Sequence, residues 1–518
     1  MSETGRVLKP ANENPWYVLM TLYGEQEGEE IDEALHEKNR AAWNAWACQS
    51  LSVEEQVSAA ASVEVALTEV QDWNQQREEI VSRHRTATEA RNGAEHYTGL
   101  PLIDEQMELS GISFSHIVCC KKFVFPVVSQ FKLASFERDA WFDNAMFGDA
   151  PTFSGAKFNG HARFDSAKFV GGASFHLAIF DRDSRFSSSQ FFGGAIFKST
   201  LFREMAMFDG VMFSGHTSFD LAEFVNKTVF HHAIFVTDVR FISVVFDGDA
   251  EFRITTFAGK ANFGSTKFNR EARFDEAKFQ SELTFSKAVF GGLSYFAATK
   301  FGVVGVALRA TFNDCRFLQS CSFGASEFLS SYPEFSGAVL HDKTTFTAKS
   351  QFWPQGKHLD PDQAKATCAA IRHNLGKQGL PEEEHFFFRR EMGFAAQIGG
   401  WWQRLPYRVF GAISDFGYSI QRPALWLFGL WLGVAMINHV VLQWAASRQG
   451  LDYHAVQAFG LSFANQFPVF GLQGRWFSVK FLGDLNPWLK ALGGVQTVVS
   501  LPLLFFFALG LRTRFRMR

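Results

Sequence analysis

Apolar side chains recur at a regular interval through the middle of the chain, and the interval fits neither an amphipathic helix nor a long strand. From Phe131 to Phe301 a phenylalanine returns after alternating steps of five and six residues, so that 32 phenylalanines form one unbroken series. The residue two positions before each of them is Ala, Ser, Thr, Val or Pro, with Leu283 as the one exception. A helix would need apolar residues at i, i+3, i+4 and i+7, which this series does not supply.

Each unit of the series is predicted to be a very short strand followed by a corner. Residues i−2 and i lie on the same face of a strand, so the small residue and the phenylalanine both point inwards. Gly, Asp, Asn and Ser are frequent between one phenylalanine and the next small residue, as turns require. A chain that turns every five or six residues coils into a β-solenoid whose coils supply hydrogen bonds to one another. Positions expected in the solenoid core include Phe131, Phe136, Phe142, Phe147, Phe213, Phe263 and Phe301.

The repeating unit resembles that of the pentapeptide-repeat family, Ala-x-Leu/Phe-x-x, and this resemblance implies a right-handed, four-sided β-helix. The alternating sixth residue departs from a strict repeat of five, and four faces of 5, 6, 5 and 6 residues predict 22 residues per coil. The rhythm extends back to Leu109 and, after a slip at residues 304–306, forward to Phe352. This length predicts about 11 coils and a rod of about 50 Å, at roughly 4.8 Å per coil. We assign residues 107–353 to the solenoid.

The N-terminal segment, residues 1–106, lacks the repeat and is predicted to be a helical cap. It is rich in Ala, Glu, Gln and Trp. One helix is expected from Ile31 to Gln49, and a second from the capping box at Ser52–Glu55 to about Asn92–Gly93. Helices at this place would cover a solenoid end, which otherwise exposes unpaired strand edges.

The segment after the solenoid is predicted to lead into a membrane. Residues 354–423 are expected to form a helical pair and an interfacial linker in which Trp401, Trp402 and Tyr407 suit the membrane surface. Its last part, Ser414-Asp-Phe-Gly-Tyr-Ser-Ile-Gln-Arg-Pro423, resembles the lead-in of membrane-bound pentapeptide-repeat proteins. Residues 424–518 are then predicted to form two transmembrane helices with a long intervening loop.

The two predicted spans are residues 424–446 and 491–511, which contain no Lys, Arg, Asp or Glu. Each is long enough to cross about 30 Å of hydrocarbon. Arginines precede the first span, at Arg404, Arg408 and Arg422, and follow the second span, at Arg512, Arg514, Arg516 and Arg518. By the positive-inside rule, the solenoid and both termini are expected in the cytoplasm, at the inner membrane of a bacterium.

The segment between the two spans has two interpretations that stay open. Residues 454–472 are apolar and broken by Pro468, and they are followed by no potassium filter of the Thr-Val-Gly-Tyr-Gly type. The order of span, apolar segment and span resembles a two-span channel with a pore helix, in which Phe467, Pro468, Phe470 and Gly471 would follow that helix. An interfacial helix in the outer leaflet explains the same residues. His439 lies about 22 Å along the first span, where a polar residue near the outer interface costs little.

Composition and charge exclude several classes of function. The chain contains 60 phenylalanines among its 518 residues, and its net charge of −3 argues against a nucleic-acid partner. Residues 131–301 contain 19 acidic and 19 basic side chains, so they do not copy the charge of DNA as the DNA-mimicking members of the family do. The six cysteines include no CxxC pair, and none of the common catalytic or nucleotide-binding motifs is found.

Single residues that suggest chemistry are better explained as structural. Cys315 and Cys321 each stand two positions before a phenylalanine, which predicts core thiols and not a metal pair. His36, close to Glu33 and Glu37, is expected on a solvated helix face. We therefore predict no catalytic residue, no cofactor and no metal site.

These observations predict a non-enzymatic, membrane-anchored scaffold whose solenoid binds protein partners that the sequence does not identify. The alternative is an oligomeric two-span channel that the solenoid regulates, because a pore built from two spans per chain requires a homo-oligomer.

Overall fold

Residues 8–92, 97, 99–125, 127–356, 359–449 and 454–515 are described by a computed structural model, and they divide into two units. The first unit contains the residues up to Asp360 together with His373–Leu380. The second contains Pro361–Arg372 and Pro381–Arg518.

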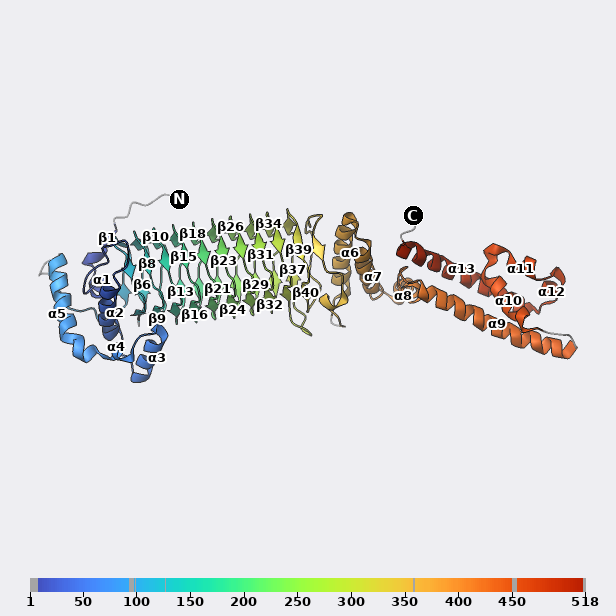
Figure 1. Ribbon diagram of the computed structural model, residues 1–518, viewed down its shortest axis with the longest axis horizontal. Coiled ribbons are helices and arrows are strands. Elements are labelled where there is room, and N and C mark those ends of the chain that lie inside the picture. The colour runs from blue at the N-terminus through green and yellow to red at the C-terminus, as the bar shows by residue number, and fades with distance from the viewer. Residues whose placement is uncertain are drawn as a thin grey trace. The chain divides into compact units, whose positions relative to one another are not determined.

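The first unit is built around a β-solenoid of parallel strands, most of them two residues long, from β2 (Met107–Glu108) to β41 (Thr345–Phe346), as Figure 1 shows. Each strand pairs with the strand one coil away, so that Phe158 in β10 (Lys157–Phe158) pairs with Phe180 in β14 (Ile179–Phe180), 22 residues later. The strands form four long sheets of 11, 11, 10 and 7 strands. The predicted parallel solenoid of about 11 turns is therefore confirmed, and its right-handed sense stays a prediction.

Phenylalanine side chains fill the axis of the solenoid and stack from coil to coil. The rings of Phe136 and Phe158 lie 4.6 Å apart between centroids and within 1° of parallel. Rings on neighbouring sides meet edge to face instead, as Phe136 and Phe142 do at 86°. Both geometries are favourable for aromatic pairs. The side chains at the seven core positions named from the sequence are at most 2% exposed, and they are Phe131, Phe136, Phe142, Phe147, Phe213, Phe263 and Phe301.

The five-residue and six-residue steps make two kinds of corner. In the five-residue step the N–H of Ala134 donates to the carbonyl of Phe131 at 3.2 Å, and Leu133 between them has a φ of 55°. A left-handed residue at this place is the mark of a type II turn. In the six-residue step Gly160 approaches the coil below so closely that a Cβ would lie 2.4 Å from the backbone of Arg138. Each coil therefore alternates between two kinds of corner: a left-handed turn in the five-residue step and a close backbone contact in the six-residue step.

The small residue after a left-handed corner can carry a hydroxyl or a thiol, because a backbone carbonyl lies within hydrogen-bond distance of it. Thr255 Oγ1 donates to the carbonyl of Phe230, 25 residues earlier, at 2.7 Å. Cys315 makes the equivalent contact with the carbonyl of Phe285 at 2.9 Å. Cys315 and Cys321 are 0% and 1% exposed, so the prediction of core thiols is confirmed.

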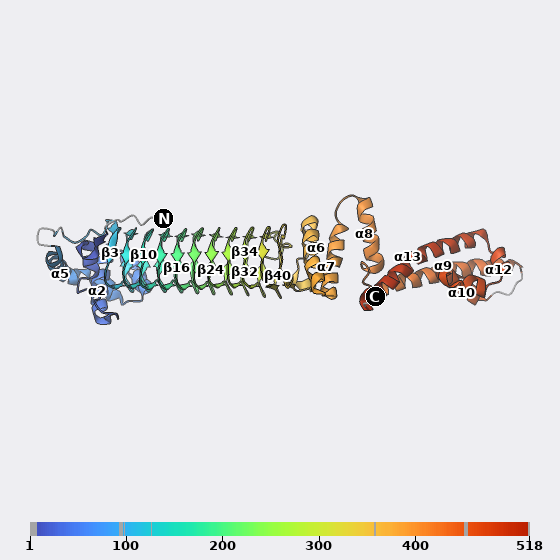
Figure 2. The same ribbon diagram turned by 90° about the horizontal axis from the view of Figure 1, so that it is seen from above.

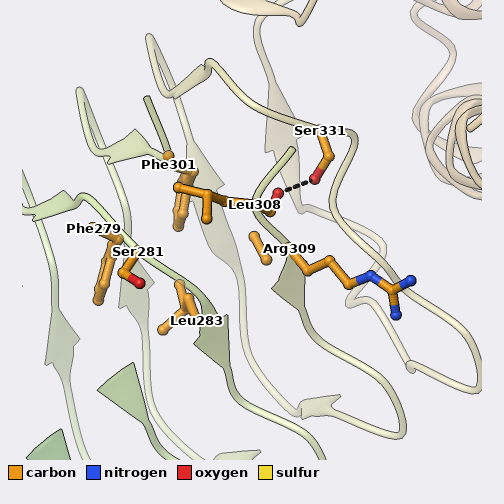
Figure 3. Close-up of a pocket in the computed structure, with 9 residues that line it drawn as sticks. Phe279, Ser281, Leu283, Phe301, Leu308, Arg309 and Ser331 are labelled. Carbon is orange, nitrogen blue, oxygen red and sulfur yellow. Dashed lines mark hydrogen bonds between the residues drawn. The ribbon is translucent and has the colours of Figure 1, made fainter. Parts of the chain in front are cut away.

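The predicted slip of the repeat is an insertion that bulges out of the solenoid wall. Phe301 and Phe328 still stack at 4.7 Å, although 27 residues separate them where other coils have 22. The extra residues project outwards, and Val304 is 75% exposed. Ser331 Oγ donates to the carbonyl of Leu308 at 2.5 Å and holds the base of the bulge (Figure 3). The crevice between the bulge and Phe279 has no room for a water molecule.

Among the described residues before the solenoid there are five α-helices, and they are α1 (Pro15–Met20), α2 (Glu33–Ala47), α3 (Val53–Val63), α4 (Leu67–Gln71) and α5 (Trp73–Asn92). The capping box between Ser52 and Glu55 is present. The prediction of one continuous helix from there to Asn92 is wrong, because Glu64 adopts a left-handed φ of 57° and ends α3. The break allows Val63 and Val70 to bury their side chains in one cluster with Cys48. Gly93 lies outside the described residues.

Helix α2 covers the first coils of the solenoid, as Figure 2 also shows. Trp43 Nε1 donates to the carbonyl of Val124 at 2.9 Å, and the Trp43 ring stacks on Phe123 at 5.6 Å. The strand β1 (Lys9–Pro10) pairs with β3 (Ile112–Phe114) and so covers one sheet edge. The prediction that His36 lies on a solvated face is wrong: its side chain is 2% exposed, because this face of α2 packs on the solenoid.

The other end of the solenoid is closed by a tryptophan and a helix. Trp353, which follows the 3-10 helix η3 (Ser350–Phe352), stacks on Phe328 at 4.9 Å. The last core position is therefore Trp353, and the extrapolation of the repeat to Phe352 is off by one residue. Asn374 and Gln378, in the last turns of α6 (Pro361–Gln378), donate to the carbonyls of His341 and Thr344 at 3.0 and 2.7 Å. Both ends of the stack thus have partners within the first unit.

The second unit is helical. It contains the helices α7 (Pro381–Ala395), α8 (Trp401–Ser414), α9 (Gln421–Gln449), α10 (Ala455–Gln466), α11 (Leu472–Trp476), α12 (Val479–Asp484) and α13 (Pro487–Phe515) and the 3-10 helix η4 (Pro468–Phe470). Within the described residues, two segments are long and apolar enough to cross a membrane, Gln421–Arg448 and Pro487–Phe515. Only 22% of the most apolar stretch of each is buried, so both expose apolar surface.

Candidate functional site

Helix α10 packs lengthwise between the two apolar helices and runs antiparallel to α9. Gln466 Nε2 donates to the carbonyl of Leu427 at 3.1 Å, and Ser462 Oγ donates to that of Trp431 at 2.8 Å. About one turn before Ser462, the carbonyl of Phe459 accepts a hydrogen bond from Trp431 Nε1 at 3.2 Å. The helix therefore ends beside Leu427, six residues from the start of α9, with its axis along that of α9.

Polar side chains join α10 to α13 as well. Gln496 Nε2 donates to both the carbonyl and the Oγ of Ser462, at 3.0 and 2.9 Å. Thr497 Oγ1 donates to the carbonyl of Asn465 at 2.9 Å. The close approach depends on Gly493, where a Cβ would lie 2.7 Å from Asn465 Nδ2. These side chains form a polar seam between the helices, which consists of Ser462, Asn465, Gln466, Gln496 and Thr497. The outer surface of the unit is apolar.

Three buried amide atoms of the helical unit lack a hydrogen-bond partner among the described residues. They are Asn438 Nδ2, Gln466 Oε1 and Gln496 Oε1, on side chains that are 1%, 3% and 1% exposed. A buried polar atom without a partner costs about 1–3 kcal/mol. Such groups are typical places for buried water.

The residues named from the sequence as a pore or interfacial segment lie at opposite ends of α10. His439 is half-buried on α9, with its ring 6.5 Å from that of Phe459. Phe467 and Pro468 follow the other end of α10 and are half-buried. Phe470 is 63% exposed, and Gly471 is exposed with a φ of 61°. The structure does not bring the five residues together.

Sequence analysis missed three buried amide side chains of the helical unit. Asn438, Gln466 and Gln496 come from three separate helices, and each stands in an uncharged segment. The signal was available, because polar residues within apolar spans mark candidate functional positions. It was applied to His439 alone, and the neighbouring Asn438 is the more buried of the two.

Helix α8 presents an apolar stripe to the outside of the second unit. Trp401 and Trp402 are 61% and 69% exposed, and Leu405 and Val409 continue the same face one and two turns later. After this helix, Asp415 accepts a hydrogen bond from Arg389 of α7 at 3.0 Å and lies 3.6 Å from Arg422 of α9. This carboxylate therefore joins α7 to the start of the first apolar helix.

The strongest candidate for reactive chemistry is the contact between Cys119 and His36. Cys119 Sγ lies 3.3 Å from His36 Nδ1. Burial raises the pKa of the Cys119 thiol to about 12 and lowers the pKa of His36 to about 4. Both groups are therefore neutral at pH 7, whereas a reactive cysteine needs a lowered pKa. Within the described part of the chain, no group of three His, Cys, Asp or Glu side chains could hold a metal ion.

Comparison with known proteins identifies the solenoid. The family model for pentapeptide repeats, described as nine copies, matches residues 142–190. No curated protein and no solved structure matches the chain. The matched residues pair in register with the coils before and after them, through Phe136 and Phe158 and through Phe180 and Phe202. The fold is thus a pentapeptide-repeat β-solenoid, followed in the chain by two helices that could span a membrane.

Proposed function

We propose that the protein is a membrane-anchored scaffold without enzymatic activity, in which the sides of the solenoid bind protein partners. The main support is the closure of both solenoid ends, by Trp43 and α2 at one and by Trp353 and α6 at the other. Partners then have the sides of the coils as their contact surface. The fold itself is generally used for structure and not for catalysis.

Two sides of the solenoid differ in a way that suits protein recognition. The sheet that contains β11 (Ala162–Arg163) is covered by ion pairs, such as Arg163 with Asp143 at 3.1 Å and Arg185 with Asp165 at 2.8 Å. The sheet that contains β12 (Lys168–Phe169) has an uncharged strip in its middle coils. Its outward side chains there include Phe192, Ile234 and Val236, which are 46%, 42% and 45% exposed. Exposed apolar strips of this kind mark interaction surfaces.

Photo-crosslinking of the full chain in its native membrane tests the scaffold function. A photoreactive residue at Ile234 is expected to form an adduct with one discrete protein, and the same residue at Arg185 is not. The adduct at Ile234 should disappear with Phe192→Glu in the same chain. If no side of the solenoid forms adducts with protein, the scaffold function is wrong.

The membrane anchor is proposed to consist of α9 and α13, with α8 in the interface. Arg422 lies in the first turn of α9, and Arg512 and Arg514 lie in the last turn of α13, so the positive-inside rule supports a cytoplasmic location of these ends, at the inner membrane of a bacterium. Full-length protein should resist extraction by alkaline carbonate, and a chain truncated after Arg422 should be extracted. Release of the full-length protein by carbonate would contradict the anchor.

The alternative function, an oligomeric channel, is favoured by one observation. Helix α10 runs along α9 and ends deep between the apolar helices, which is the placement of a re-entrant helix and not of one lying flat in the outer leaflet. Planar-bilayer recording with purified protein tests conduction. Currents that change with Gln496→Leu would support the channel, and a monomer in detergent that passes no current would exclude it.

A further inference from the structure

A cavity of about 380 Å³ opens between α10, α12 and α13 in the second unit. One wall is apolar and consists of Leu461, Leu482, Leu485 and Leu489. The volume lies within the range of small-molecule sites, about 300–1,000 Å³. The cavity is separate from the three unpartnered amides of the helical unit, none of which lines it.

The other wall of the cavity is polar and contains one charged side chain, Lys490 in the first turns of α13. Its ammonium group donates to the carbonyl of Gly483 at 2.6 Å, so its contact is a neutral oxygen. Asn465, which is 4% exposed, lies at the buried end and accepts a hydrogen bond from Gln473 through Oδ1. A ligand here would meet a cation and amide groups on one side and leucines on the other.

Two adjacent glycines on α13 shape the cavity. Gly493 permits the contact with Asn465, where a Cβ would lie 2.7 Å from Nδ2. At Gly494 an added Cβ would have no heavy atom within 4 Å, so this position faces open space in the cavity wall. A larger side chain at Gly494 can therefore fill the cavity without disturbing the packing of α10.

We propose that this cavity binds a phospholipid with an anionic headgroup, with the phosphate beside Lys490 and an acyl chain along the leucines. Lys490 is exposed, so water solvates its ammonium group when no ligand is bound. An uncharged apolar ligand would displace that water without supplying a counter-charge, and a free anion would leave the apolar wall uncovered. The cavity opens at the end of α13 opposite to Arg512 and Arg514, so the lipid comes from the leaflet at that end. The proposal rests on the membrane insertion proposed above.

Lipid retention by the full-length protein tests the proposal. Protein purified from membranes is placed in vesicles of phosphatidylcholine with or without phosphatidylglycerol of the same acyl chains, extracted into detergent and analysed by native mass spectrometry. We expect one retained phosphatidylglycerol per chain and a rise in the thermal midpoint. Lys490→Gln and Gly494→Val should each lower the retained fraction at least tenfold. The matched controls Lys480→Gln, on α12 outside the cavity, and Gly433→Val, on the exposed side of α9, should not.

The results that would contradict the lipid site differ from those that would contradict the membrane anchor. Equal retention of both lipids, or unchanged retention in Lys490→Gln, overturns the site. The same thermal shift with inorganic phosphate alone shows a free anion site and also overturns it, as does a second copy of the chain that occupies the cavity. Carbonate extraction is measured on the same samples: protein that stays in the membrane but retains no lipid contradicts this proposal alone, and protein that is extracted contradicts the proposed anchor.

Discussion

The solenoid and the helical unit differ in how their buried polar side chains find hydrogen-bond partners. Where the residue after a left-handed corner of the solenoid carries a hydroxyl, as Thr200 and Thr255 do, that hydroxyl donates to the carbonyl of a phenylalanine 25 residues earlier. In the helical unit, Gln466 and Gln496 each retain an unpartnered oxygen. The repeat supplies the same backbone acceptor after the left-handed corners, whereas the buried Ser184 Oγ, after the other kind of corner, has no partner among the described residues. Without a repeat, each partner must come from another segment or from a bound molecule.

The largest effect that distinguishes the two regions should come from the stacked core. Phe213→Ala removes a ring that is 0% exposed and stacks on Phe191 and Phe235 at 5.0 and 4.9 Å. We expect a loss of about 3–5 kcal/mol in the free energy of unfolding, measured by chemical denaturation. Phe192→Ala, at a 46% exposed position, is the control and should cost less than about 1 kcal/mol. A change below about 1 kcal/mol for Phe213→Ala would remove this residue from the core.

Acid should weaken the N-terminal cap more than the coils. Burial lowers the pKa of His36 from 6.5 to about 4, so the unfolded chain binds the proton more tightly than the folded one. The stabilisation is present above pH 6.5 and is lost as the pH falls towards 4, by about 3 kcal/mol at most, since one pKa unit corresponds to 1.36 kcal/mol. Hydrogen exchange of α2 between pH 7 and 4.5 measures it. His36→Gln should flatten this dependence, and an equally steep profile in the variant would assign it to another group.

A smaller effect should test the hydroxyl contacts of the solenoid. Thr255→Val keeps the shape of the side chain and removes its donation to the carbonyl of Phe230, which also accepts from the N–H of Ala233. We expect a loss of about 1 kcal/mol in the free energy of unfolding. Thr255→Ser retains the hydroxyl and serves as the control for this bond. If Val and Ser variants unfold at the same denaturant concentration, the hydrogen bond contributes nothing measurable.

The smallest net effect is expected in the polar seam of the helical unit. Gln496→Leu removes two donated bonds to Ser462 together with one unpartnered oxygen, and these contributions have opposite signs. We expect the unfolding free energy in detergent to change by less than about 1 kcal/mol. Gln443→Leu, at an exposed amide of α9, is the comparison. A loss of several kcal/mol would instead indicate that Gln496 Oε1 has a tightly held partner such as water.

The solenoid was predictable because its determinants are local and repeated. The small residue, the phenylalanine and the turn recur in every unit, so each copy supports the same strand and corner. The break after Val63 was not predictable in this way, since it depends on burial against Cys48, a residue of the preceding helix end. The end of the stack was missed by one residue because the chain leaves the repeat before Trp353 inserts over Phe328.

The site in the helical unit was only partly predictable. Two apolar helices followed directly from the absence of charge in residues 424–446 and 491–511. The placement of α10 could not be derived from its composition, because it depends on pairings such as Gln466 with Leu427 and on the missing side chain of Gly493. Periodicity finds faces of helices and strands, whereas this seam is formed by single residues from three helices.

The bulge before Leu308 makes the solenoid a natural host for inserted sequence. The coils on either side stack as they do elsewhere, although the chain between them is five residues longer, so coil pitch does not depend on the length of the connection. Val304 and Gly305 stand outside the wall, and their surroundings place no limit on size. A fluorescent protein or an epitope inserted between them would project from the side of the solenoid. It would report the position of the protein in a living cell.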